Sequence, residues 1–162
     1  MSGQMRWFGW GEPSHPIELP PAAEQMLRSE LGVTGARTPP VALDEVRLPE
    51  VVAVPSGLAD VVGAASVVTD REARIRHAAG RSYPDLVRLR SGDASGAPDA
   101  VVLPGSHDEV AEVISICDAE GVAVVPFGGG TSVVGGVEAV RGAFAAAVTL
   151  DLRRLDGIAL DR

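Results

Sequence analysis

The stretch Val122-Ala123-Val124-Val125 runs directly into Pro126-Phe127-Gly128-Gly129-Gly130-Thr131-Ser132. The apolar half predicts a short buried strand, and the glycine-rich half predicts the loop that leaves it. Consecutive glycines reach φ > 0 without steric cost and expose their N–H groups, so the backbone can curl around an anion. Because ligands lie at the carboxyl ends of strands in open α/β units, the run predicts a diphosphate site to which the threonine and serine add hydroxyl donors.

Two better-known phosphate loops are excluded. No Gly-Lys-Ser/Thr follows the run, so it is not a Walker loop, and Val133 stands where G-x-G-x-x-G counted from Gly128 requires glycine. A glycine-rich connector without a ligand is the alternative that these residues leave open.

Composition limits the classes of function. The 162 residues, 46% of them hydrophobic, suffice for one globular core, and a net charge of −8 argues against a nucleic-acid partner. All 14 basic residues are arginine, which suggests a GC-rich bacterial source. The single cysteine, Cys117, excludes an internal disulfide, and no histidine or cysteine pair has metal-ligand spacing. No transmembrane segment or secretory signal is visible, so we expect a cytoplasmic protein.

The second half of the chain predicts a βαβ unit. Ala100–Leu103 reads as a strand, and Ser106–Glu109 reads as a capping box that opens a helix ending at Gly121. The buried face of this helix is expected to comprise Val110, Val113, Ile114 and Cys117. The strand at 122–125 then runs parallel to the first, residues 145–152 form a third strand, and 158–160 begin a fourth.

The first half is less regular. Residues 1–21 form an arm in which Trp7 and Trp10 are candidate anchors, and Pro21–Leu31 reads as a helix stopped by Gly32. Its buried stripe is expected to be Met26, Leu27 and Leu31. Residues 33–60 read as loop with one or two helical turns, and Pro84 opens further turns that carry Leu86 and Leu89.

The domain boundary is placed at the small-residue stretch 91–98. The predicted organisation is a helical amino-terminal region over 1–92 and a partial, truncated ligand-binding subdomain over 97–162. The fold class is α+β.

Few other side chains suggest chemistry. His107 fits helix-start solvation, His15 is inert, and Cys117 fits core packing. His77 could border a substrate channel, although a surface position is favoured. The remaining candidates are four arginines for which a solvated charged face is favoured over contact with a phosphate-bearing substrate, namely Arg71, Arg74, Arg76 and Arg81.

Several motifs together resemble a known family. Pro104-x-x-His107-Asp108-Glu109-Val110, Val125–Ser132 and Asp151-Leu152-x-x-Leu155 resemble the first half of the FAD-binding domain of the vanillyl-alcohol oxidase/p-cresol methylhydroxylase superfamily. Arg6-Trp7-Phe8-Gly9-Trp10-Gly11 resembles the Lys-Trp-x-Gly-Trp-Gly opening of alkyldihydroxyacetonephosphate synthases and their bacterial relatives. The stretch Arg74–Gly92 also fits that subfamily.

The resemblance implies FAD as the cofactor, with the diphosphate held by Pro126, Phe127, Gly128, Gly129, Gly130, Thr131 and Ser132. It implies FAD-dependent alkyl transfer in ether-lipid synthesis, in which a fatty alcohol replaces the acyl chain of acyl-dihydroxyacetone phosphate. The alternatives are an FAD-linked oxidase or dehydrogenase of 2-hydroxy acids and a non-catalytic remnant.

The family's second flavin subdomain and cap domain are missing from the sequence, so we expect an amino-terminal fragment or one part of a split enzyme. No catalytic residue is assigned. We expect no turnover from this chain alone, and a small-molecule or lipid substrate only if the missing domains complete the protein. Strands at 147–152 and 158–160 would then form an open apolar edge prone to self-association.

Overall fold

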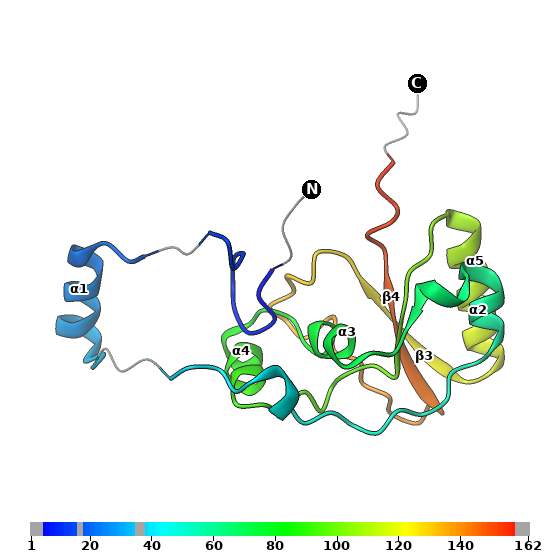
Figure 1. Ribbon diagram of the computed structural model, residues 1–162, viewed down its shortest axis with the longest axis horizontal. Coiled ribbons are helices and arrows are strands. Elements are labelled where there is room, and N and C mark those ends of the chain that lie inside the picture. Colours follow the sequence, from blue (N-terminus) through cyan, green and yellow to red (C-terminus); the bar gives the residue numbers. More distant parts are fainter. Residues whose placement is uncertain (1–4, 16–17, 35–37, 158–162) are drawn as a thin grey trace.

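A four-stranded sheet forms the centre of the protein in the computed structural model, which describes residues 5–15, 18–34 and 38–157 (Figure 1). The strand order is β1-β2-β4-β3. The four strands are β1 (Val67–Val68), β2 (Ala100–Val102), β3 (Val122–Phe127) and β4 (Ala146–Asp151).

Strand β4 pairs parallel with both β2 and β3, whereas β1 pairs antiparallel with β2. The predicted α+β fold with a βαβ unit is confirmed. β3 extends two residues beyond the prediction, through Phe127. The expectation that β4 forms an open edge is wrong, because β4 lies between two partners. The predicted strand at 158–160 lies outside the described residues.

Strand β3 is the edge strand that follows the helix of the βαβ unit. The N–H of Leu152 donates to the carbonyl of Phe127, so the backbone groups of Phe127 face β4. Since the N–H groups of alternate residues point to opposite sides of a strand, position 126 would direct its N–H outward. Proline has no N–H, so Pro126 removes a donor from the edge without loss to the ladder.

One face of the sheet is covered by α2 (Gly57–Val62) and α5 (His107–Ala119), which lie side by side in Figure 1. A one-turn helix, η2 (Ala64–Ser66), connects α2 to β1. This face holds the larger hydrophobic cluster, whose buried members include Leu58, Val113, Cys117, Val148 and Leu150.

The other side of the sheet is flanked by α3 (Arg71–Arg76) and α4 (Tyr83–Arg90), preceded along the chain by the one-turn helix η1 (Leu43–Glu45). A second cluster packs there, with buried residues Trp7, Val46, Ile75, Ala78, Ala79, Leu89, Ala94 and Ala97. Trp7 therefore anchors the arm as expected, whereas Trp10 is 53% exposed.

Helix α5 begins at the predicted cap, with a changed partner. Ser106 Oγ accepts from the N–H of Glu109, but the Glu109 carboxylate accepts from Gly105 N at 2.6 Å rather than from Ser106. Val113 and Cys117 are buried as predicted. The expectation for Ile114 is wrong, because its side chain is 48% exposed while Ile116 packs against the core.

Helix α1 (Pro21–Leu31) has its predicted bounds, and Gly32 ends it with φ 63°. The predicted buried stripe is wrong: none of its residues is buried, and Met26 and Leu31 are 57% and 69% exposed. Figure 1 shows α1 at one end of the molecule, away from the sheet. Periodicity identified the helix, but no other described element lies close enough to cover its apolar side.

Replacing one buried leucine tests the position of the core. Leu58 is fully buried between α2 and the sheet, so we expect Leu58→Ala to lower the free energy of unfolding by about 3 kcal/mol, through lost burial and the cavity left behind. The matched control Leu31→Ala removes the same atoms from an exposed site and should change it by less than about 0.5 kcal/mol. Urea unfolding measures both, and equal losses would contradict the assignment of the core.

Candidate functional site

The glycine-rich loop starts where β3 ends, at the edge of the sheet where the parallel strands β2 and β4 also end. None of the backbone N–H groups from Gly128 through Ser132 donates a hydrogen bond within the described part of the chain. Gly128, Gly129 and Thr131 are exposed. Successive N–H groups without acceptors provide partial positive charge for an anion. The loop can therefore bind an anion through its backbone alone.

The three glycines serve different purposes. Only Gly130 has a positive φ, at 66°, so the expected left-handed conformation holds at one position of the run. A Cβ on Gly128 would meet nothing within 4 Å, and one on Gly129 would meet only the Thr131 side chain, at 3.7 Å. The space at the Cβ positions of these two glycines is thus open. Gly130 instead makes room for the Phe127 ring, which a Cβ would overlap.

The other predicted site residues support the loop. Pro126 has no N–H and lies exposed at the strand edge, and Phe127 is buried beneath the loop. Ser132 Oγ accepts from the N–H groups of Val134 and Gly136, at 3.4 and 3.2 Å, so it caps the turn that follows. The seven residues are brought together, and five of them present free N–H groups. Contact between these residues and a cofactor stays a prediction.

A buried ion pair lies beside the loop. His77, at the end of α3, is 3% exposed, and its Nε2 lies 2.8 Å from Asp151 Oδ2 at the end of β4. Its Nδ1 lies 2.7 Å from the carbonyl of Ala73, so both ring nitrogens face acceptors. The favoured surface position for His77 is therefore wrong. The ring also lies against Phe127, with centroids 4.3 Å apart.

Asp151 is fully buried, and its carboxylate contacts His77 and Arg153. Burial alone would raise the pKa of its carboxyl, but hydrogen bonds from His77 and Arg153 outweigh burial and lower the pKa to about 2. Arg153 donates to Asp151 through its backbone N–H, Nε and Nη2. The carboxylate consequently stays ionised at neutral pH and fixes the end of β4 to α3.

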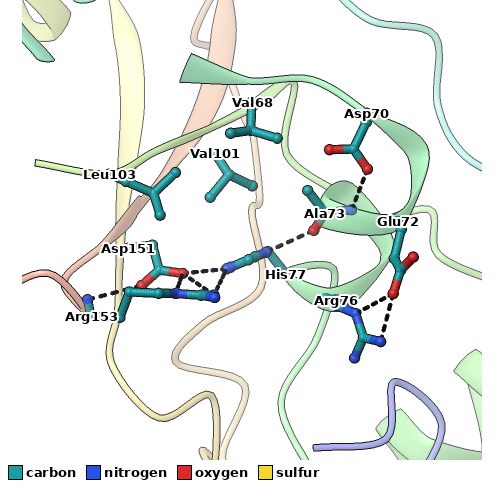
Figure 2. Close-up of a pocket in the computed structure, with 10 residues that line it drawn as sticks. All are labelled: Val68, Asp70, Glu72, Ala73, Arg76, His77, Val101, Leu103, Asp151 and Arg153. Carbon is teal, nitrogen blue, oxygen red and sulfur yellow. Dashed lines mark hydrogen bonds and ion pairs between the residues drawn. The ribbon is translucent and has the colours of Figure 1, made fainter. Parts of the chain in front are cut away.

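A pocket of about 310 Å³ opens above this pair. Figure 2 shows His77 and Asp151 in it, with Val101 and Leu103 from the end of β2 and with the first turns of α3. Its charged side chains all have partners: Arg76 pairs with Glu72 at 2.6 Å, Arg153 pairs with Asp151, and Asp70 accepts from the N–H of Ala73. The pocket thus lies at the same strand ends as the loop but presents no charge that lacks a partner.

The expectation of a solvated arginine face is wrong for two of the four arginines. Arg74 is 4% exposed and donates to the carbonyls of Pro98 and Pro49, and Arg81 is 5% exposed. Burial lowers the pKa of both guanidinium groups. Arg71 reaches the carbonyls of residues 43, 44 and 46, so it holds the η1 turn. These arginines bind backbone carbonyls and join distant segments.

The structure separates the remaining candidates from the loop. Cys117 is fully buried in the core, where burial raises the pKa of its thiol, and His107 is exposed at the start of α5 as expected. Sequence reasoning missed Asp99, which is fully buried and accepts from Val52 N, Ala147 N and Arg141. An aspartate directly before an apolar strand gave no signal of that role.

Comparison with known proteins identifies the domain. Residues 98–162 match the family described as FAD binding domain. The chain is 30% identical to alkyldihydroxyacetonephosphate synthase of Dictyostelium discoideum over 96% of its own length and 30% of that protein. It is 34% identical to Protein Rv2250A of Mycobacterium tuberculosis, over 62% of this chain and 70% of that protein.

The fold agrees with the sequence matches. A solved structure of alkyldihydroxyacetonephosphate synthase superposes with a TM-score of 0.83 at 28% identity, covering 98% of this chain and 34% of that one. Similarity to D-2-hydroxyglutarate dehydrogenase of Xanthomonas citri reaches 42% identity but covers only 40% of this chain.

The chain belongs to the FAD-binding flavoproteins of the vanillyl-alcohol oxidase/p-cresol methylhydroxylase type. Within that family it resembles the alkyldihydroxyacetonephosphate synthase branch. It spans about 30% of the length of the synthase from Dictyostelium and about a third of the solved one. In the part of the chain that the structure describes, no helix is long and apolar enough to cross a membrane.

Acid unfolding tests the buried pair. The pKa of Asp151 is about 2 against an ordinary 3.8, so its ionisation contributes about 2 kcal/mol of stability above pH 4. This contribution is lost as the pH falls from about 4 to about 2. Asp151→Asn should lower the free energy of unfolding at pH 7, and its difference from wild type should shrink below pH 4. Urea unfolding between pH 2 and 7 measures this, and a difference that is constant with pH would contradict it.

Proposed function

We propose that this chain is the FAD-binding unit of an enzyme of the alkyldihydroxyacetonephosphate synthase type, and that Gly128–Ser132 binds the FAD diphosphate. The row of five N–H groups without acceptors at the end of β3 supports this most directly. A diphosphate carries the negative charge that such a row stabilises. The open space in front of Gly128 and Gly129 lets the phosphates approach the backbone.

In this proposal, the residues of this chain bind the FAD diphosphate and orient the cofactor. FAD, when bound, supplies the reactive flavin ring. The N–H groups of Gly128–Ser132 would hold phosphate oxygens, and the buried Phe127 ring fills the space below the loop. We assign no proton transfer to His77, because its ring is buried and both nitrogens are held by Ala73 and Asp151. This chain thus contributes cofactor binding, and no catalytic side chain is assigned to it.

The extent of similarity favours the synthase branch over the dehydrogenases. The synthase alignment spans 96% of the chain, so it includes the amino-terminal region that precedes the FAD-binding match. The D-2-hydroxyglutarate dehydrogenase alignment covers 40%. Alkyl transfer from a fatty alcohol to a dihydroxyacetone phosphate backbone would require the two thirds of the synthase that this chain does not match. We therefore propose that this chain contributes cofactor binding to that activity.

One substitution tests the loop without disturbing the fold. Gly129 has no positive φ and open space at its Cβ position, so Gly129→Val should fold normally while its side chain fills the phosphate cradle. Isothermal titration with FAD should show binding to wild type and at least tenfold weaker binding to Gly129→Val, which corresponds to about 1.4 kcal/mol.

Cys117→Ala is the control, because Cys117 lies in the core on the opposite face of the sheet and its loss should leave FAD affinity unchanged. Wild-type affinity in Gly129→Val, or absence of FAD binding by wild type, would overturn the proposal.

A further inference from the structure

We propose that the segment His77–Arg81, which joins α3 to α4, is the positioning element of the phosphate loop. It contacts Phe127, the residue before the loop, whose ring lies against Gly130, and it contacts Ser132 at the close of the loop. This inference rests on the proposed FAD site. It assigns His77, Gly80 and Arg81 a positioning role, not contact with the cofactor.

Before the loop, the Phe127 ring contacts both His77 and Gly130. The His77 and Phe127 rings lie 4.3 Å apart with their planes tilted by 52°. The tip of the Phe127 ring, at Cζ, occupies the place where a Cβ on Gly130 would lie. Because His77 is held through both nitrogens, it cannot turn away from Phe127 without breaking a buried hydrogen bond. The contact between Asp151 and His77 therefore fixes the Phe127 ring, and the ring in turn fixes the position of Gly130.

At the close of the loop, Gly80 and Arg81 hold Ser132. The N–H of Arg81 donates to the carbonyl of Ser132 at 2.6 Å. A Cβ on Gly80 would overlap the same carbonyl oxygen. The φ of Gly80 is not in the left-handed region, so glycine is needed here for close approach and not for backbone conformation. Ser132 in turn caps the next turn through Val134 and Gly136.

These two contacts matter because the loop has few others. In the described part of the chain, Gly128, Gly129 and Thr131 make no hydrogen bond through backbone or side chain. A binding site keeps its geometry to within about 0.5 Å only when supporting residues hold it. The segment His77–Arg81 supplies that support from outside the loop, so it can alter FAD affinity without touching FAD.

The test compares two glycine-to-alanine variants. Gly80→Ala places a methyl group against Ser132, whereas Gly121→Ala strains a left-handed turn at the opposite end of β3, with nothing within 4 Å of the new Cβ. Both are expected to lower the melting temperature, but Gly80→Ala alone should raise the FAD dissociation constant, by tenfold or more. In the absence of FAD, NMR order parameters of residues 128–132 should fall in Gly80→Ala and stay at the wild-type level in Gly121→Ala.

Phe127→Leu keeps an apolar side chain but removes the ring between His77 and Gly130, and it decides the outcome if Gly80→Ala does not fold. Its FAD dissociation constant should rise at least threefold, again with reduced order at residues 128–132. Wild-type affinity and wild-type loop order in the folded variants would overturn the positioning role. Unaltered FAD binding by Gly129→Val would instead overturn the FAD site, so the two failures are distinguishable.

Discussion

The buried ion pair between Asp151 and His77 connects the two halves of this protein. Asp151 ends the central strand β4, whose alternate residues pack into the core with α2 and α5, and His77 ends α3 on the other side of the sheet. Residues 74 positions apart in sequence are thus fixed within 2.8 Å. Phe127, the last residue of β3 before the glycine-rich loop, packs on His77. The position of the loop therefore depends on a charge pair that the loop itself does not contain.

An acidic chain that binds a diphosphate has to overcome its own charge. With a net charge of −8, the protein's overall field opposes an approaching anion. In the proposed site, the N–H groups of the loop would supply positive partial charge over a few ångströms, without a lysine or arginine. The arginines that sequence alone would offer as phosphate ligands, Arg74 and Arg81, are buried on backbone carbonyls and serve the fold. In the proposed site, backbone N–H groups would thus contribute more to diphosphate binding than charged side chains.

Sequence patterns correctly predicted the features that depend on neighbouring residues. The helix starting at Ser106, the strand ending in the glycine run and the stop at Gly32 each depend on neighbours within a turn, and all three are present. Burial in the first half was predicted poorly, since His77 and Arg74 are enclosed by segments 24 to 74 residues away, while Leu31 finds no cover. The order of the strands, with β4 in the centre, likewise depends on long-range pairing that periodicity does not record. The glycine-rich loop was therefore predictable from the sequence. The contacts that His77–Arg81 makes with its neighbours were not.

The amide resonances of residues 128–132 report directly on the proposed contacts with the FAD phosphates. In a ¹⁵N-labelled sample titrated with FAD, the signals of Gly128–Ser132 should move furthest, because their N–H groups are proposed to donate to the phosphates. The signals of Gly121 and Gly142, which lie before β3 and before β4 and so away from the strand ends that carry the loop, should stay in place. Loop signals that remain unmoved at saturating FAD, or the largest shifts elsewhere, would contradict the account.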